Sequence, residues 1–234
     1  MSAETGRLRC VAILPAGGSG MRFGGGIPKQ FAEHGGRPLI GWAIARLVES
    51  GLVDRIVVAV PGAHRSLAEA IIREGAWSAA IDLANGGATR QESVWNALES
   101  APESELVAVH DAVRPNVSAA TLGSLLDAAA RWGGAIPGLP LTDTIHRVEG
   151  AFVVESPRRQ EWVAAQTPQC FRREILVEAM KRARDEGWVG TDEAGIVARH
   201  GGKVRVLDGD PRNVKVTWRE DLGRLPLGLG EDAE

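Results

Sequence analysis

The segment VAILPAGGSGMRFGGGIPKQF, residues 11–31, carries the residue types best suited to chemistry on phosphates. An apolar run typical of a buried strand passes directly into glycines, and two cations follow, Arg22 and Lys29, with no acidic residue between them. Because glycine has no Cβ, backbone N–H groups in such a loop can approach phosphoryl oxygens closely, and the cations offset their charge. The segment predicts a cradle for a polyphosphate. The alternative is an ordinary glycine-rich turn with incidental cations.

Two common phosphate motifs do not fit this loop. The dinucleotide pattern GxGxxG requires a glycine where Phe23 stands. The Walker pattern requires Gly-Lys-Ser/Thr, whereas Lys29 lies between Pro28 and Gln30. What remains is GSGMR followed by PKQ, which indicates a phosphate loop of another kind.

A second group of polar residues occurs in VHDAVRP, residues 109–115, where Asp111 and Arg114 follow an apolar run. An aspartate there can hold a divalent cation that bridges phosphates, or it can bond a ribose hydroxyl. The alternative is an Asp–Arg pair that ties the loop. We expect His110 to pack or to form hydrogen bonds rather than to titrate in a mechanism.

Two further segments frame possible sites. In NGGATRQESVWNAL, residues 85–98, Thr89 is a plausible N-cap and Glu92 stands at the capping-box position, so a helix is predicted to start there. Lys215 lies between Val214 and Val216 in an extended stretch, so its side chain points opposite to both valines. If the valines face the core, the lysine faces solvent or a pocket.

Short apolar runs alternate with helical patterns along the chain. Strands are predicted near 9–14, 55–60, 105–110 and 203–207, and helices near 40–48, 63–74, 90–100, 118–131, 172–186 and 192–200. This alternation indicates an α/β fold with a mainly parallel central sheet. Ligands in such folds lie beyond the carboxyl ends of the strands, here after residues 14, 60 and 110.

Residues 140–166 interrupt the alternation with extended segments around a Glu149-Gly150 turn. A two-stranded hairpin is marginal alone in water, so we expect this β-arm to protrude and to pack on another surface, for which a second subunit is one candidate.

Composition limits the class of protein. The 234 residues predict a single domain, 1–234, with the arm inside it. The net charge of −3 supplies no field that would attract nucleic acid or a membrane surface. No apolar run is long enough to span a bilayer, and the first ten residues do not have the pattern of a signal peptide, so a cytoplasmic protein is expected. Cys10 and Cys170 match no metal or redox spacing and are expected to be buried thiols.

Several motifs in order carry a family resemblance that extends from about residue 9 to about residue 222. They are PAGGSGMRFGGGIPKQF, NGGATRQESV, VHDAVRP, TDT, AQTPQCF, TDEA and NVKVT. Together they resemble the 2-C-methyl-D-erythritol 4-phosphate cytidylyltransferases, the CTP-using enzymes of the non-mevalonate isoprenoid pathway. The resemblance implies a Rossmann-like nucleotidyltransferase fold and a homodimer formed through the β-arm. Cytidylyltransferases acting on ribitol 5-phosphate or another alditol phosphate share HDAxRP and TPQ and stay open as an alternative.

The resemblance also implies roles for individual residues. Arg22 and Lys29 match the cations that stabilise the transition state. The residues matching the CTP site are Pro15, Ala16, Gly17, Gly18, Gly87, Ala88, Ser93, Asp111 and Ala112. Those matching the site of the sugar phosphate are Arg159, Lys215, Thr142, Asp143, Thr167 and Arg114, with Arg158 an alternative register for Arg159. Mg²⁺ or another divalent cation is expected near Asp111, with Asp210 as a second candidate.

Overall fold

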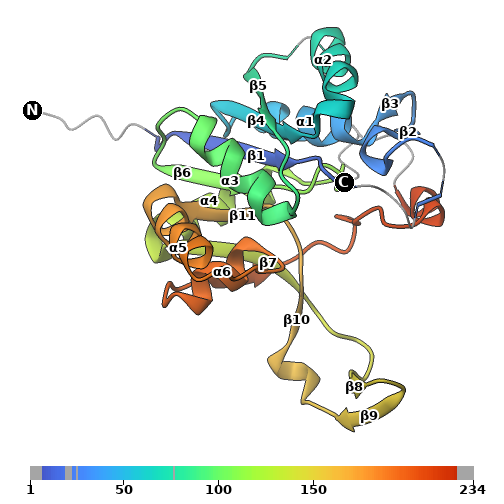
Figure 1. The fold of residues 1–234 in the computed structure, drawn as a ribbon, viewed down its shortest axis with the longest axis vertical. Coiled ribbons are helices and arrows are strands. Elements are labelled where there is room, and N and C mark those ends of the chain that lie inside the picture. The colour runs from blue at the N-terminus through green and yellow to red at the C-terminus, as the bar shows by residue number, and fades with distance from the viewer. Residues whose placement is uncertain (1–6, 19–22, 25, 76, 226–234) are drawn as a thin grey trace, which may run out of the picture.

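A computed structural model describes residues 7–18, 23–24, 26–75 and 77–225. Its centre is an eight-stranded sheet in the order β10-β7-β11-β6-β1-β4-β5, with β12 paired to β7 (Figure 1). The parallel strands of one half are β1 (Cys10–Pro15), β4 (Arg55–Val60), β5 (Ala80–Asn85) and β6 (Leu106–Val109). The predicted mainly parallel sheet is confirmed.

The other half of the sheet contains the antiparallel pairs. Its strands are β7 (Gly134–Pro140), β10 (Val163–Ala165), β11 (Gln169–Arg172) and β12 (Arg205–Asp208). Strand β11 runs antiparallel to both β6 and β7, whereas β12 runs parallel to β7. A Cβ at Gly138 would lie 2.9 Å from Val206 and 3.0 Å from Val163, so the glycine allows three strands to approach one another.

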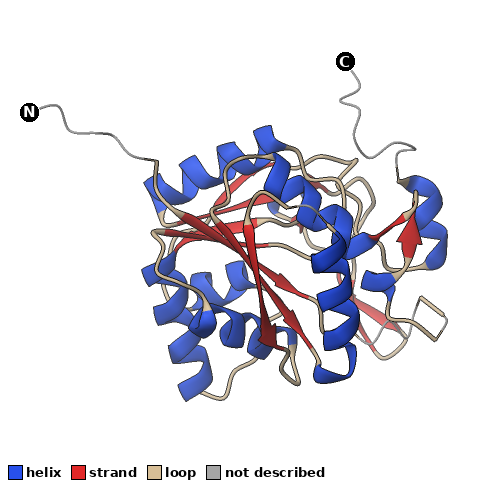
Figure 2. Cartoon of the chain, turned by 90° about the horizontal axis from the view of Figure 1, so that it is seen from above, coloured by secondary structure: helices blue, strands red, loops and turns tan. Residues whose placement is uncertain are grey.

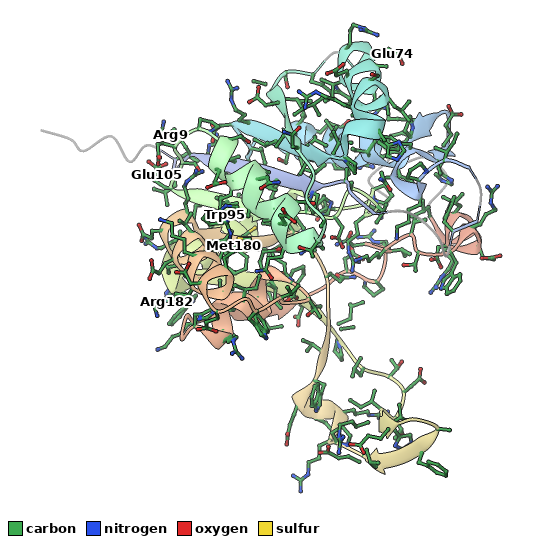
Figure 3. All side chains as sticks on the ribbon, viewed as in Figure 1. Arg9, Glu74, Trp95, Glu105, Met180 and Arg182 are labelled. Carbon is green, nitrogen blue, oxygen red and sulfur yellow. The ribbon has the colours of Figure 1, made fainter. Side chains whose placement is uncertain are left out.

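Helices cover both faces of the sheet, as Figure 2 shows. They are α1 (Leu39–Glu49), α2 (Arg65–Glu74), α3 (Arg90–Ser100), α4 (Ala119–Trp132), α5 (Arg173–Asp185) and α6 (Glu193–Arg199). One apolar cluster joins α1, α2 and α4 to the sheet through residues such as Ile44, Leu125 and Leu14. A second cluster joins α3, α5 and α6 to the opposite face and includes Trp95 and Met180 (Figure 3). Burial on both faces explains the nearly continuous apolar character of β1 and β4.

Short elements complete the chain. They are the strand pair β2 (Glu33–His34) and β3 (Arg37–Pro38) and the 3₁₀ turns at Lys29–Phe31, Gly62–His64, Arg159–Glu161 and Arg219–Arg224.

The predicted hairpin is present as β8 (Arg147–Glu149) and β9 (Phe152–Glu155), joined through Gly150 at a φ of 59°. It extends well away from the sheet (Figure 1). Apolar side chains of the arm face outward: Phe152 in β9 is 77% exposed, and Trp162, which follows the hairpin along the chain, is 53% exposed. An apolar surface of this kind on a protruding element is typical of an interface.

Two further features concern the cysteines and the lengths of the helices. Cys10 and Cys170 are free and buried, as predicted, and burial raises the pKa of the Cys10 thiol to about 12. Among the described residues no helix is long and apolar enough to cross a bilayer.

Candidate active site

A cleft of about 430 Å³ opens at the carboxyl ends of β1, β5 and β6. The loops after these strands meet there, as expected for a parallel sheet. Its walls include every residue that the resemblance assigns to the CTP site, together with Lys29 and Lys215. Arg22 lies outside the described residues. Four further wall residues, Gln30, Thr89, Arg90 and Val113, were not predicted from the sequence to bind a ligand.

The loop after β1 is held by Gln30, whose side chain is 2% exposed. Its Nε2 donates to the carbonyl oxygens of Ala16 at 2.6 Å and Gly18 at 3.3 Å. The neighbouring Lys29 Nζ donates to the carbonyl oxygen of Val216 at 3.0 Å, so the lysine joins the glycine loop to the C-terminal segment. The two side chains fix one wall of the cleft and leave a cation on it.

The loop after β5 is shaped by the first turn of α3. Thr89 caps the helix by accepting from the Glu92 backbone N–H, which confirms the predicted helix start. The Glu92 carboxylate reaches back to the backbone N–H of Ala88 rather than to that of Thr89, one residue earlier than in a standard capping box. Ser93 Oγ accepts from the Gly87 N–H at 3.0 Å and donates to the Thr89 carbonyl oxygen. The 87–89 backbone is thereby held against the cleft.

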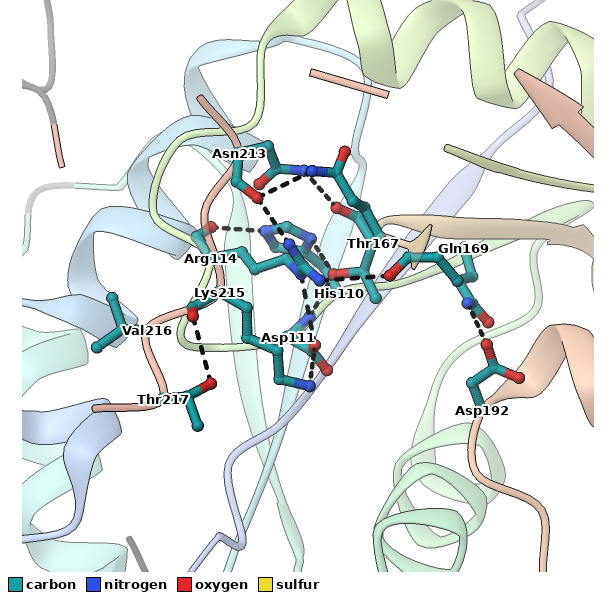
Figure 4. Close-up of polar contacts among 12 residues, drawn as sticks. His110, Asp111, Arg114, Thr167, Gln169, Asp192, Asn213, Lys215, Val216 and Thr217 are labelled. Atoms are coloured by element: carbon teal, nitrogen blue, oxygen red, sulfur yellow. Dashed lines mark hydrogen bonds and ion pairs between the residues drawn. The ribbon is translucent and has the colours of Figure 1, made fainter. Parts of the chain in front are cut away.

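Asp111 lies in the wall of the cleft and contacts three cations, of which Arg114 and Lys215 are labelled in Figure 4. Its Oδ2 lies 2.8 Å from Lys215 Nζ and 3.6 Å from Arg114 Nε, and its Oδ1 lies 3.3 Å from Arg90 Nη2. Burial alone would raise the pKa of this carboxyl, but Arg90, Lys215 and Arg114 outweigh it and hold the pKa well below its usual range. Asp111 is therefore a permanent anion in a site whose described charges are otherwise positive.

Arg90 connects this wall to α6. Its Nη1 donates to both carboxylate oxygens of Glu193, at 2.7 and 2.9 Å, and the Glu193 side chain is fully buried. Burial would lower the pKa of Arg90, but Glu193 and Asp111 raise it above its usual value. The two residues are separated by 103 positions, which explains why spacing gave no signal for the pair.

His110 is fully buried and belongs to a fixed hydrogen-bond chain (Figure 4). The Thr167 hydroxyl accepts from the Asp111 backbone N–H at 3.0 Å and lies 3.0 Å from His110 Nδ1. His110 Nε2 lies 2.9 Å from the Arg114 carbonyl oxygen, which can only accept, so Nε2 carries the proton and Nδ1 accepts from Thr167. Burial lowers the pKa of His110 to about 4, so the expectation that this residue packs and hydrogen-bonds is met.

Similarity to known proteins agrees with this geometry. The family model described as 2-C-methyl-D-erythritol 4-phosphate cytidylyltransferase matches residues 10–227. The chain belongs to this family.

Individual relatives cover nearly the whole chain. A 2-C-methyl-D-erythritol 4-phosphate cytidylyltransferase of Deinococcus radiodurans is 44% identical over 223 residues, covering 95% of this chain and 90% of the relative. One of Geobacillus thermodenitrificans is 39% identical over 211 residues, covering 90% and 92%. The crystal structure of the Thermus thermophilus enzyme of that name superposes with a TM-score of 0.75 at 33% identity and covers 93% of this chain and 96% of that one.

Some residues that the family resemblance assigns to the sugar phosphate support the cleft from behind. Arg114 is 7% exposed and donates to the carbonyl oxygens of Asn213 at 2.6 Å and Ala165 at 3.5 Å. Thr167 is bonded as described above, and the side chain of Asn213 donates to its carbonyl oxygen. The loop-tying interpretation of Arg114 thus fits its contacts, and Lys215 is the substrate-side candidate that reaches the cleft.

The remaining candidates for binding the sugar phosphate lie on the arm. Thr142, Asp143 and Arg159 belong to residues 140–166, and the Arg159 guanidinium donates to the Thr142 carbonyl oxygen. The structure joins Arg159 to Thr142, and none of the three residues is among the described walls of this chain's cleft.

The carboxylates can be tested as a place for a divalent cation. Among the described residues no group of three or more His, Cys, Asp or Glu could hold a metal. Asp111 is the one carboxylate in the described walls of the cleft, whereas Asp210 binds Arg212 through both of its oxygens and is not part of these walls. Since Mg²⁺ is commonly bound by one or two carboxylates together with substrate phosphates, Asp111 fits a metal that arrives with a nucleotide.

Proposed function

We propose that this chain transfers the cytidylyl group of CTP to 2-C-methyl-D-erythritol 4-phosphate and releases pyrophosphate. The observation that carries the proposal is the cleft at the carboxyl ends of β1, β5 and β6. There, a glycine loop, a capped helix start and the cations Lys29 and Lys215 surround one carboxylate, on a chain that belongs to the cytidylyltransferase family.

The reaction needs no general base. The nucleophile is a phosphate monoester whose second pKa is about 6, so it is already ionised at neutral pH. The buried His110 is neutral and committed to two hydrogen bonds, in agreement with a mechanism without a histidine base. The obstacles are repulsion between two polyanions and the charge that develops on the α-phosphoryl group. Positioning and electrostatic stabilisation overcome both.

The roles follow from where the side chains lie. Lys29, with Arg22 by motif position, would neutralise the developing charge, and Lys215 would attract the incoming phosphate as a point charge. The 87–89 backbone, fixed by Ser93, offers amide and carbonyl groups to a pyrimidine edge. Asp111 would hold Mg²⁺ that enters with CTP, and the metal would supply charge neutralisation between the phosphates.

The proposal includes a homodimer that forms through the arm. Arg159 and Thr142 belong to the arm and are not among the described walls of their own cleft, so they would serve a sugar phosphate if the arm of a second copy reaches it. The outward apolar residues Phe152 and Trp162 supply the surface for such a homodimer. Phe152→Asp should therefore give a monomer by sedimentation at micromolar concentration. Leu67→Asp, at an exposed position on α2, should leave the dimer intact. A monomeric wild-type chain would refute the dimer.

Turnover tests the reaction itself. Pyrophosphate release should require CTP and 2-C-methyl-D-erythritol 4-phosphate and should fall sharply with ATP, GTP or UTP. Ribitol 5-phosphate belongs in the same assay because the shared motifs do not separate the two alditol phosphates. Preference for ribitol 5-phosphate would replace the substrate but keep the chemistry, whereas no pyrophosphate release with any pair would reject the proposal.

A further inference from the structure

The TDEA segment, residues 191–194, has no part in the proposed chemistry, yet it places a buried charge behind the cleft. Glu193 is fully buried and is not among the described residues that form the cleft walls. Both of its carboxylate oxygens accept from Arg90 Nη1, and Arg90 does line the cleft. Glu193 therefore makes contact with the described cleft walls through Arg90.

Arg90 is held between two carboxylates. While Nη1 binds Glu193, Nε and Nη2 face Asp111 Oδ1 at 3.4 and 3.3 Å. The other oxygen of Asp111 binds Lys215 at 2.8 Å. Glu193, Arg90, Asp111 and Lys215 thus form a row of alternating charge, contributed by α6, α3, the loop after β6 and the C-terminal segment.

The α6 end of this row is firmly anchored. Asp192 caps the helix by accepting from the Gly195 N–H at 2.9 Å. Gln169 then brackets the same turn, because its Oε1 accepts from the Ala194 N–H at 2.9 Å and its Nε2 donates to Asp192 Oδ2 at 2.8 Å. The carboxylate of Glu193 therefore presents a fixed partner to a long and otherwise adaptable arginine side chain.

We propose that Glu193 is a positioning residue that keeps the Arg90 guanidinium on Asp111 and away from the nucleotide phosphates. An arginine fork binds phosphate oxygens well, so an unanchored Arg90 beside a triphosphate would leave Asp111. Asp111 would then lose one of the contacts that orient it toward Lys215. This inference rests on the proposed cytidylyl transfer. It adds a residue, Glu193, that holds the charged side chains of Arg90 and Asp111 in place in the cleft.

Glu193→Gln is the discriminating substitution. It preserves the shape of the side chain but replaces one acceptor of Arg90 Nη1 with a donor and removes the negative charge. We expect kcat to fall roughly tenfold or more, in line with the cost of a small misplacement in an active site. The Kd of CTP, measured by calorimetry, should stay unchanged or become tighter, because the cleft loses a negative charge behind it. A purely structural role would instead weaken CTP binding together with thermal stability.

Two further variants complete the test. If Glu193 acts through Arg90, the combined Arg90→Gln and Glu193→Gln substitutions should lower kcat no further than Arg90→Gln alone, and this neutral pair avoids an uncompensated buried charge. Glu186→Gln removes an exposed carboxylate that pairs with Arg199 and should change neither kcat nor the Kd of CTP.

The outcomes are separable. Additive losses in the double variant, unchanged kcat in Glu193→Gln, or a weakened Kd in that variant would each overturn the positioning role. A wild-type chain that binds no CTP would overturn the proposed function, and the inference with it. Wild-type turnover with normal Glu193→Gln turnover overturns the inference alone.

Discussion

Replacement of Lys29 by methionine tests the electrostatic account of the cleft most directly. The lysine lies on the cleft wall beside the glycine loop, and methionine keeps most of its length without the charge. A unit charge about 4 Å from a developing charge contributes about 4 kcal/mol at an effective dielectric constant of about 20. Since about 1.4 kcal/mol corresponds to a factor of ten in rate, the limit is about 10³-fold. Partial solvation reduces this, so we expect kcat to fall roughly 10²–10³-fold.

The same substitution should change stability only slightly. Lys29 Nζ donates a hydrogen bond of 3.0 Å to the Val216 carbonyl oxygen, and loss of a hydrogen bond of this kind costs about 1 kcal/mol. For a chain of this size that corresponds to a shift in Tm of about 2–4 °C.

The assay is pyrophosphate release at saturating CTP and sugar phosphate, with Tm measured in parallel. Lys181→Met, on the exposed side of α5, is the matched control and should retain wild-type kcat. Turnover of Lys29→Met within about threefold of wild type, with the protein folded, would refute the reasoning. A loss of kcat accompanied by a fall in Tm of about 15 °C, far beyond the shift expected for one hydrogen bond, would instead assign the lysine to stability.

Two other predictions concern the buried His110 and the base-side loop. Burial lowers the pKa of His110 from 6.5 to about 4, so between those pH values the unfolded chain binds a proton that the folded chain does not. The free energy of unfolding should therefore fall by about 3 kcal/mol as the pH decreases through that window. Urea titrations at several pH values should show a weaker dependence of this free energy on pH in His110→Gln. An equal pH dependence in both proteins would contradict the prediction. A Cβ at Gly86 would lie 2.9 Å from Pro61 N and 3.0 Å from Val60 C, so Gly86→Ala must displace the loop and should raise the KM for CTP several-fold. Gly62→Ala, with open space at its Cβ, should not, and equal KM values for the two variants would show that the loop does not bind the nucleotide.

Much of the fold was predictable because its signals are local. Short-range patterns predict these elements: apolar runs predict the strands β1, β4 and β6, and the helical spacing of apolar residues predicts the helices. The missed strands β5, β7 and β11 lack such signals. Strand β5 pairs with β4 and is largely exposed. Strand β7 contains two glycines and two prolines, residue types with low strand propensity, and at Gly138 the neighbouring strands leave no room for a Cβ. Their extended conformation is imposed by pairing across the sheet.

The sequence by itself determined which residue types could bind a nucleotide: a glycine loop with Lys29, a capped helix start at Thr89, and an aspartate after a buried strand. Each motif is a short continuous segment, so the order of the motifs along the chain was enough to show the family resemblance and to predict most of the residues in the cleft walls.

Only the tertiary structure decided how those residues act together. The fold pairs Lys215 with Asp111, and it brings the Gln30 side chain into a hydrogen bond with the glycine loop. It also pairs Arg90 with Glu193, which lies 103 positions away in the sequence. It also separated Arg159 from the cleft of its own chain. Charged side chains interact over a few ångströms of space whatever their distance along the chain, so these partnerships exist only once the sheet has brought the carboxyl ends of its strands together.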